Sequence, residues 1–252
     1  MHQEDLVSII TPSYNSQDFI QETINSVISQ THQNWEMIIV DDASSDGTPT
    51  LLKEISKKES RVKYHLLKNN SGPAVARNKA IELAQGKYLA FLDADDIWFP
   101  FHLTNSIATI KDKKVPFVFA SYKRSNENLE FVYSDFVVPE KVTYSDILKT
   151  NSISCLTAFV NVSKLGKEKM PLIKKRQDMG LWLTYLKKIP YAHGIQECHA
   201  IYRIRENSLS RDKKKLIAFQ WEFYRNVENL NIFQSIYYML WWMYLGYKKY
   251  KN

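Results

Sequence analysis

The chain has 252 residues and a hydrophobic content of 44%, enough to bury one large core or two small ones, which argues against a disordered protein. Its formal net charge of +7 and isoelectric point near 9.1 suit nucleic acid, an anionic membrane surface or a phosphorylated small molecule equally well. Cys155 and Cys198 are too few for a disulfide framework and form no Cys-x-x-Cys zinc pair, so we expect a reducing, cytoplasmic setting.

The first hundred residues alternate short β-branched runs with amphipathic segments, and residues 1–6 lack the basic and apolar runs of a secretion signal. The order predicts parallel βαβ units, because a crossover helix is the economical link between parallel strands. The predicted strands are residues 6–11, 35–40, 62–67 and 88–92. The predicted helices are residues 19–30, a second that starts at Thr48 as N-cap with Pro49 at its first position, and residues 74–84 closed by Gly86.

Acidic residues follow two of these predicted strands. Asp41 and Asp42 come after the second strand, and Asp93, Asp95 and Asp96 come after the fourth. Because the carboxyl ends of parallel strands share one edge, we expect these carboxylates to converge where open α/β sheets bind ligands. Neighbouring carboxylates repel one another and suit a shared cation, although each group taken alone also fits a solvated Asp-rich turn. The Gly-x-Gly-x-x-Gly fingerprint of dinucleotide-binding proteins is missing after the first strand.

The pattern is less regular beyond residue 100. The expected elements are a helix at 103–110, strands at 117–120, 131–134 and 157–160, a mobile basic loop at 164–176, and a helix at 177–186. Asp178 stands at or near the start of the last helix, where a carboxylate also stabilises the helix dipole. Residues 202–211 combine three arginines with two serines, side chains that can donate hydrogen bonds to phosphate oxygens. The alternative is that this segment is a solvated loop.

Residues 232–247 are the most apolar stretch of the chain and contain two tryptophans among five tyrosines or phenylalanines. As a helix, about sixteen residues at about 1.5 Å each cover roughly 24 Å, less than a hydrocarbon core of ~30 Å. Dense aromatic residues followed by lysines are typical of a helix that lies in the membrane interface. We therefore expect peripheral contact with the inner face of the cell membrane through residues 232–251. Packing on the protein's own core, or on a second copy in a homodimer, is the alternative.

Five stretches of the chain share their sequence and their order with a known family. They are residues 7–15 (VSIITPSYN), 39–48 (IVDDASSDGT), 72–78 (GPAVARN), 91–96 (FLDADD) and 177–182 (QDMGLW). On these motifs, which span about the first 210 residues, the chain resembles the family 2 inverting glycosyltransferases, in particular the bacterial enzymes that build capsule, teichuronic acid or O-antigen chains.

The resemblance implies an α/β chain with a glycosyltransferase A fold, a Rossmann-like nucleotide-sugar-binding domain with a mostly parallel central sheet. That domain would cover residues 1–212, with a nucleotide-binding half at 1–100 and an acceptor-side half at 101–212. Residues 213–252 would form a C-terminal helical extension.

The resemblance also implies roles for single residues around the nucleotide. Pro12 and Tyr14 would lie against the nucleobase. Asp42 would accept a hydrogen bond from the imide of that base, since a pyrimidine N–H needs an acceptor. Arg77 and Arg203 would approach the diphosphate and stabilise its charge.

Two further motifs imply the metal site and the general base. Asp93 and Asp95 match the family's Asp-x-Asp pair, with Asp93 nearer the ribose and Asp95 a ligand of Mg²⁺ or Mn²⁺, which prefer oxygen donors. Asp178 matches the position of the base that deprotonates the acceptor hydroxyl. Gln177 stands where many relatives carry glutamate, so this pair holds one carboxylate instead of two.

The predicted function is therefore inverting transfer of a sugar from a nucleotide-sugar, with UDP favoured, to a hydroxyl of a surface polysaccharide or a lipid-linked glycan. One alternative is a nucleotidyltransferase of sugar activation, which usually has a glycine-rich loop where this chain has residues 12–15. A basic nucleic-acid-binding protein would not explain carboxylates at two strand ends, so we expect no nucleic acid partner. A catalytically inactive binding module is a third alternative. The donor sugar, the acceptor and the linkage depend on the shape of the pocket.

Overall fold

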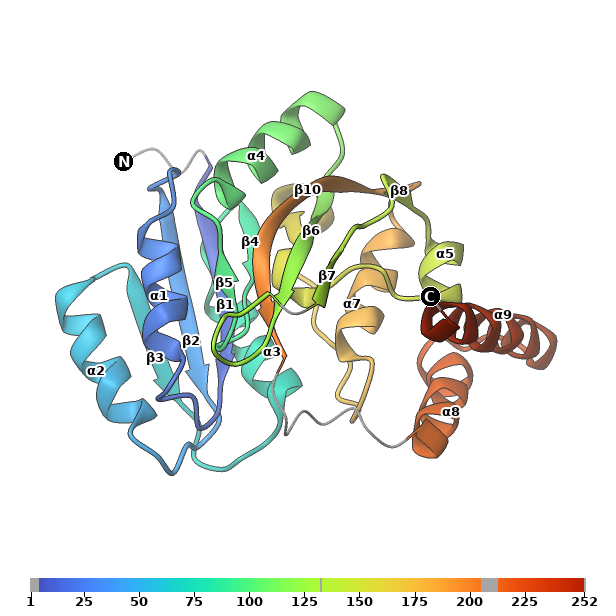
Figure 1. The fold of residues 1–252 in the computed structure, drawn as a ribbon, viewed down its shortest axis with the longest axis horizontal. Helices are drawn as coiled ribbons and strands as arrows, with labels where there is room; N and C mark the ends of the chain where they lie inside the picture. The colour runs from blue at the N-terminus through green and yellow to red at the C-terminus, as the bar shows by residue number, and fades with distance from the viewer. Residues whose placement is uncertain (1–4, 132, 205–212, 252) are drawn as a thin grey trace.

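A computed structural model describes residues 5–131, 133–204 and 213–251, and its centre is a ten-stranded sheet with helices on both faces (Figure 1). The strands are β1 (Val7–Ser13), β2 (Trp35–Asp41), β3 (Val62–Leu66), β4 (Tyr88–Phe91), β5 (Ile97–Trp98), β6 (Phe117–Ser125), β7 (Tyr133–Phe136), β8 (Lys141–Val142), β9 (Phe159–Asn161) and β10 (Ala192–Arg203). Their order is β3-β2-β1-β4-β9-β6-β10-β5, with β7 beside β6 and β8 beside β10.

The helices divide between the two faces of the sheet, and each face has its own apolar core. Side chains of α1 (Ile20–Ile28), α2 (Thr48–Lys58) and α4 (His102–Lys113) pack on one face. On the other face lie α3 (Pro73–Leu83), α5 (Tyr144–Lys149), η1 (Cys155–Thr157), α6 (Val162–Leu165), α7 (Gln177–Leu186), α8 (Lys213–Glu222), η2 (Phe223–Val227) and α9 (Ile232–Lys251). The resulting helix–sheet–helix layers are the arrangement that buries both faces of a mostly parallel sheet.

The N-terminal half of the sheet is parallel, as the alternation of strands and helices predicts. Strands β3, β2, β1 and β4 pair in parallel, with Val7 of β1 opposite both Trp35 of β2 and Tyr88 of β4. The chain order therefore reverses between β1 and β4, which creates a switch point at their carboxyl ends. In the C-terminal half, β9 inserts antiparallel between β4 and β6, and β10 runs parallel to β6.

Two predictions of helix ends differ from the structure. Thr48 is the first residue of α2 rather than its cap, and its hydroxyl accepts the Ser16 N–H at 2.9 Å. Gly86 does not cap α3, which ends at Leu83. Glycine is required at position 86 because a Cβ there would lie 2.7 Å from the carbonyl oxygen of Leu6, too close for any side chain.

The basic segment predicted as a mobile loop is instead fastened to the domain. It begins in α6, and further along Met170 is held through both backbone groups by the Asn78 amide: its N–H donates to Oδ1 at 2.7 Å and its carbonyl accepts from Nδ2 at 2.8 Å. Lys167 donates to the backbone carbonyl of Ala84. Because Asn78 lies on α3, the segment that leads to α7 is tied to the N-terminal half of the fold.

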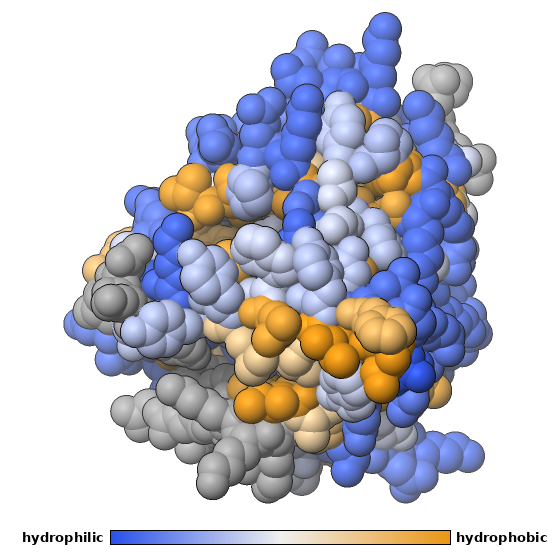
Figure 2. All heavy atoms as spheres, turned by 90° about the vertical axis from the view of Figure 1, so that its right-hand side faces the viewer, coloured by the Kyte–Doolittle hydropathy of each residue, from blue (hydrophilic) through white to orange (hydrophobic). Residues whose placement is uncertain are grey.

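The C-terminal helices pack on the domain with one side and are exposed on the other. Phe223 and Tyr224 of η2 are buried, and the Tyr224 hydroxyl donates to the carbonyl of Leu148 at 2.5 Å. Figure 2 views the side of the molecule on which α9 lies in Figure 1 and shows orange areas beside paler ones. In α9, Ser235 and Met239 face inward, whereas large apolar and aromatic side chains gather on the outer face. This outer face comprises Phe233, Tyr237, Leu240, Tyr244 and Tyr247, spaced as one side of a helix.

Helix α9 is longer than the apolar stretch suggested. It has 20 residues, because the helix continues through the lysine-rich end of the chain to Lys251. Within the described ranges, none of the helices combines the length and the hydropathy that crossing a membrane requires.

Candidate active site

Two cavities open along the carboxyl ends of β1, β2 and β4. The first, here called the β1–β4 cavity, has a volume of about 370 Å³, and the second, the α7 cavity, about 530 Å³. The wall between them is Asp93, which lines both. The structure thus brings together the acidic ends of two strands, as expected from the parallel order. The first cavity contains Pro12, Tyr14, Asp42 and Asp95, and the second contains Arg77 and Asp178.

Tyr14 follows directly on β1 and is 49% exposed, so its ring is open to a flat ligand. The turn that carries it is cross-linked to the loop after β2. Asn15 has a left-handed backbone, with a φ of 46°, and its N–H donates to the Ser44 hydroxyl at 2.8 Å. The Asn15 side chain in turn accepts the Ser45 N–H at 2.9 Å. These bonds fix the position of Tyr14 before any ligand arrives.

Asp42 is buried and shapes the roof of the β1–β4 cavity. Its two carboxylate oxygens accept the backbone N–H groups of Ser71 and Gly72, each at 2.7 Å. Gly72 has a φ of 91°, a backbone conformation that side chains strongly disfavour. Asp42 therefore holds the loop before α3 over the cavity, and its remaining lone pairs are available to a ligand.

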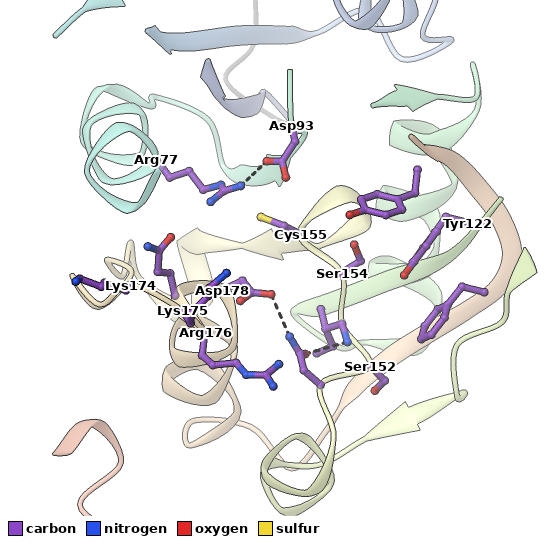
Figure 3. A pocket seen from close by; sticks show the side chains of 15 residues that line it. Arg77, Asp93, Tyr122, Ser152, Ser154, Cys155, Lys174, Lys175, Arg176 and Asp178 are labelled. Carbon is purple, nitrogen blue, oxygen red and sulfur yellow. Dashed lines mark hydrogen bonds and ion pairs between the residues drawn. The ribbon is translucent and has the colours of Figure 1, made fainter. Parts of the chain in front are cut away.

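Arg77 and Asp93 form an ion pair across the top of the α7 cavity, with Nη2 and Oδ1 2.5 Å apart (Figure 3). The Arg77 side chain is 11% exposed. Burial is the largest single influence on its pKa and lowers it, but the charge and hydrogen bond of Asp93, together with the nearby Cys155 and Asp178, outweigh burial, so that the pKa of Arg77 is raised. Its Nε is buried and has no hydrogen-bond partner among the described residues. Arg77 thus keeps a donor for an anion in addition to its bond to Asp93.

Asp95 and Asp96 differ in environment although they are neighbours. Asp95 is half-buried on the wall of the β1–β4 cavity. Asp96 is 1% exposed and accepts the Arg203 N–H at 2.9 Å, while its Oδ2 finds no partner in the described part of the chain. Burial first, and then the charges of Asp95 and Asp93, raise the pKa of Asp96 well above its usual value. Asp96 is therefore a structural group and not a ligand of the cavity.

Asp93 and Asp95 fit a divalent cation only together with ligands that a bound substrate would supply. No group of three or more His, Cys, Asp or Glu side chains that could hold a metal ion exists among the residues the structure describes. Asp93 and Asp95 nonetheless line one cavity, and their oxygens are the ligand type that Mg²⁺ and Mn²⁺ prefer. Two carboxylates leave the other coordination positions to phosphate oxygens and water, so the residues present fit a metal that arrives with a diphosphate.

Asp178 lies in the first turn of α7 and faces the α7 cavity opposite Arg77 (Figure 3). The Asn151 Nδ2 donates to its carboxylate at 3.0 Å. Asn151 is oriented in turn, because its Oδ1 accepts the Ile153 N–H at 3.2 Å and only its amide nitrogen is left to face Asp178. The carboxylate is thus aimed into the cavity with one oxygen engaged.

Gln177 makes a contact that a glutamate could not make. Its Nε2 donates to the carbonyl of Ile173 at 2.6 Å, which ties the helix start to the preceding segment. That segment supplies Lys174, Lys175 and Arg176 to the rim of the α7 cavity. The thiol of Cys155 also lines this cavity, but burial raises its pKa, so it is protonated and unreactive at neutral pH.

Arg203 lies outside both cavities, so the structure does not bring it to the predicted phosphate site. Its guanidinium pairs with Glu22 of α1, with Nη2 and Oε2 2.5 Å apart, and stands 4.8 Å from the centre of the Phe19 ring. The rest of the predicted phosphate-binding segment, Arg205, Ser208, Ser210 and Arg211, lies outside the described residues.

Much of the α7 cavity wall escaped the sequence analysis. Asn151, Tyr122 of β6 and Phe136 of β7 come from segments without a recognisable motif, and Tyr202 of β10 begins the predicted phosphate-binding segment but was not itself predicted as a site residue. The three consecutive cations before Gln177 were visible in the sequence, and their position next to Asp178 was the signal that could have identified them as part of the site.

Comparison with known proteins gives a consistent result. The sequence profile of glycosyl transferase family 2 matches residues 8–161. TuaG of Bacillus subtilis, a glycosyltransferase assigned by name to teichuronic acid biosynthesis, is 41% identical over 244 residues, which cover 97% of this chain and 95% of TuaG. WfgD of Escherichia coli, named a UDP-Glc:α-D-GlcNAc-diphosphoundecaprenol β-1,3-glucosyltransferase, is 37% identical over 98% of this chain and 97% of its own length.

Solved structures share the fold at lower sequence identity. Residues 1–349 of TarS from S. aureus, in complex with UDP-GlcNAc, superpose with a TM-score of 0.71 at 20% identity, over 95% of this chain and 71% of that one. The mannosyltransferase PcManGT of Pyrobaculum calidifontis, in complex with GDP-Man and Mn²⁺, gives a TM-score of 0.57 at 20% identity, over 86% and 61% of the two chains. These neighbours confirm the predicted glycosyltransferase A fold.

Proposed function

This chain belongs to glycosyl transferase family 2, and we propose that it transfers a sugar from a UDP-sugar to a hydroxyl of a surface-polysaccharide or lipid-linked glycan acceptor, with inversion at the transferred carbon. The coarser function, a glycosyltransferase of polysaccharide biosynthesis, follows from the family and from relatives such as TuaG and WfgD. The observation that carries the finer proposal is the placement of Asp93 between two cavities, one with the predicted nucleotide residues and one with Asp178.

In this proposal the β1–β4 cavity holds the nucleotide. Tyr14 and Pro12 contact the base, and a remaining lone pair of Asp42 accepts the base N–H. Arg77 donates to the diphosphate through the N–H groups that Asp93 does not use. Arg203 is left out of the phosphate site, because its charge is already paired with Glu22.

Asp95, assisted by Asp93, would hold a divalent cation at the diphosphate. When bound, Mg²⁺ or Mn²⁺ supplies positive charge that stabilises the departing nucleoside diphosphate. Arg77 acts on the same developing charge from the other side of Asp93, within a partly buried site where such interactions are stronger than in water.

Asp178 is the general base of the proposed reaction. An acceptor hydroxyl in the α7 cavity attacks the sugar C1 from the face opposite the diphosphate, while its proton passes to the Asp178 carboxylate. The C1–O bond to the diphosphate breaks, and its electron pair leaves with the nucleotide. Asn151 keeps the carboxylate aimed at the cavity during this step. A positioned carboxylate of this kind contributes roughly 10²–10⁴-fold in rate.

The proposed base is tested by the variant Asp178→Asn. We expect transfer to fall by about 10²–10⁴-fold, because the amide cannot accept the proton. UDP affinity, measured by calorimetry, should stay within a few-fold, because Asp178 does not line the nucleotide cavity. The matched control is Asp112→Asn, which removes an exposed carboxylate of α4 and should leave both quantities unchanged. Near-normal turnover of Asp178→Asn would remove this residue from the mechanism.

We also propose that the protein is cytoplasmic and binds peripherally to the inner face of the membrane, because a lipid-linked acceptor is presented there. What supports it is the outer face of α9, where Phe233 is 80% exposed and Leu240 is 58% exposed. The lysine-rich end of α9 and the net charge of +7 favour binding to an anionic surface.

The nucleotidyltransferase alternative is not favoured, since the family profile covers most of the nucleotide-binding half.

A further inference from the structure

Asp178 is positioned by two segments that lie far apart in the chain. One is the start of α7, which carries Asp178 itself. The other is the loop after α5, whose Asn151 amide donates to the Asp178 carboxylate at 3.0 Å, a bond drawn as a dashed line in Figure 3. The direction of the carboxylate therefore depends on how firmly α5 and the start of α7 are held relative to each other.

The start of α7 contains a residue in a disfavoured conformation. Arg176, directly before the helix, has a φ of 68° and a ψ of 24°, a left-handed backbone that is uncommon for a residue with a Cβ. Such a conformation persists where the surrounding contacts enforce it. One contact comes from α9, because the Arg176 guanidinium carbon lies 5.7 Å from the centre of the Trp242 ring, within the range of a cation–π interaction. Another is the hydrogen bond from Gln177 to the carbonyl of Ile173.

Helix α9 also supports the loop after α5, and the two helices lie side by side in Figure 1. Lys149 is the last residue of α5, and its Nζ lies 5.5 Å from the centre of the Trp241 ring. The carbonyl of Leu148 accepts the Tyr224 hydroxyl of η2 at 2.5 Å. The end of α5 is therefore fixed on the C-terminal helices two residues before Asn151.

Two consecutive tryptophans of one helix thus contact the two segments that meet at the proposed base. Trp241 contacts the cation two residues before Asn151, and Trp242 contacts the cation two residues before Asp178. Consecutive side chains on a helix diverge by about 100°, so one helix can reach both segments. Both tryptophans lie outside the β1–β4 cavity and the α7 cavity, so any effect on the reaction is indirect.

We propose that Trp241 and Trp242 are positioning residues of the transfer reaction, which hold the Asp178 carboxylate in its hydrogen bond to the loop after α5. The inference rests on the proposed role of Asp178 as the base and adds that the C-terminal extension takes part in catalysis. If the stacking on Trp242 is lost, the left-handed turn at Arg176 can relax and the carboxylate can turn away from the acceptor. Displacement of a catalytic group by about 1 Å can cost about 100-fold in rate.

The test measures UDP release from UDP-glucose, UDP-galactose and UDP-N-acetylglucosamine, with water in place of the acceptor hydroxyl and without vesicles, so that membrane binding plays no part. In Trp242→Leu, kcat on the best of these donors should fall about 10- to 100-fold while KM stays within about two-fold, because the base is misplaced and the nucleotide cavity is intact. Trp242→Phe keeps an aromatic face for the guanidinium and should recover kcat to within about three-fold of the wild type. Trp241→Leu should cost less, about three- to ten-fold, because Lys149 is also held by Asp146 at 3.9 Å.

The matched control is Tyr191→Leu, which removes a cation–π contact with Lys141 outside both cavities, 4.9 Å from the ring centre, and should leave kcat and KM unchanged. A second readout requires no substrate. The side-chain amide NMR signals of Asn151 are assigned by their loss in Asn151→Ser. In Trp242→Leu they should move toward their positions in Asp178→Ala, where the hydrogen bond is absent.

Either of two results for Trp242→Leu overturns the inference: a kcat equal to that of the wild type, or Asn151 signals that do not move. A loss of activity that Trp242→Phe does not recover also overturns it, because helix packing would then be responsible instead of the aromatic contact. If the wild type releases no UDP from these donors, the NMR signals alone decide.

The variant Asp178→Asn separates failure of this inference from failure of the proposed function. Normal turnover in Asp178→Asn contradicts the proposed base itself. Lost turnover in Asp178→Asn together with normal turnover in Trp242→Leu contradicts only the positioning role of the tryptophans.

Discussion

At the scale of single residues, the sequence Asp93-Ala-Asp-Asp96 shows how three nearby carboxylates acquire three different properties. Asp93 is paired with Arg77, Asp95 stays on a cavity wall, and Asp96 is enclosed by the protein with a raised pKa. The differences arise from the sharp turn after β4, which directs successive side chains to different surroundings. We therefore propose that Asp95 is the carboxylate of this turn that binds a cation carried by the diphosphate.

Replacement of Asp95 by alanine tests this assignment. We expect Asp95→Ala to abolish the gain in UDP affinity that Mg²⁺ or Mn²⁺ gives to the wild type, because a carboxylate ligand is lost. Calorimetric titration of UDP with the metal and with EDTA measures the effect. Asp46→Ala, which alters a carboxylate in the loop after β2 outside both cavities, is the control. A wild-type affinity that is the same with metal and with EDTA would refute the metal role altogether.

At the scale of elements, helix α9 has one side packed on the domain and one side exposed. Its inner side is part of the domain: Met239 is buried, and Trp241 and Trp242 lie near Lys149 and Arg176. Its outer side is apolar and exposed (Figure 2). Deletion of the helix would therefore disturb the core as well as the outer face, so substitutions on the outer face are the sharper test.

The double variant Leu240→Glu/Tyr244→Glu should lose binding to vesicles that contain phosphatidylglycerol. Each apolar side chain withdrawn from lipid costs about 1.5–3 kcal/mol, so the bound fraction in a flotation assay should fall more than about ten-fold. Leu66→Glu changes an exposed leucine of β3, at the opposite end of the molecule in Figure 1, and is the control. If the wild type does not float but is a dimer by ultracentrifugation, and the double variant is a monomer, a second copy covers this face instead.

The elements also show what the sequence could predict. Strands β1 to β4 and helix α7 follow from local periodicity and from turn residues at their ends, and candidate site residues could be predicted next to them because each motif is continuous in the chain. Asn151 could not be predicted, because its role depends on a loop from another part of the sheet meeting Asp178. Arg203 was expected at the phosphates, yet a distant partner, Glu22, takes its charge. Long-range partners of this kind leave no local pattern.

At the scale of the whole molecule, a buried histidine pair links α4 to β10. The Nδ1 atoms of His102 and His199 lie 3.2 Å apart, and both side chains have no exposed surface. Burial lowers the pKa of His102 well below its usual value and that of His199 to about 4. Both rings are therefore neutral in the folded protein near pH 7, where one can donate a hydrogen bond to the other.

The free energy of unfolding should fall as the pH decreases from about 6.5 toward 4. In this range the histidines of the unfolded chain take up protons near pH 6.5 while the buried pair stays neutral, so acid favours unfolding by up to about 1.4 kcal/mol per pH unit for each histidine. Urea unfolding between pH 7.5 and 5 measures the slope. His199→Asn should reduce it, whereas His65→Gln, on the exposed side of β3, should not. A slope that His199→Asn leaves unchanged would contradict this account.

Helix α3 carries two consecutive side chains, Arg77 and Asn78, that contact different parts of the protein. Arg77 reaches the wall that both cavities share, and Asn78 holds Met170, from which the chain runs on to residues 174–176 and Asp178. In the proposed reaction, a single turn of α3 would therefore connect the phosphate site of the donor with the rim of the acceptor cavity. A displacement of α3 on nucleotide binding would then move Arg77 and the segment held by Asn78 together, so the same short piece of backbone would set the position of one substrate relative to the other.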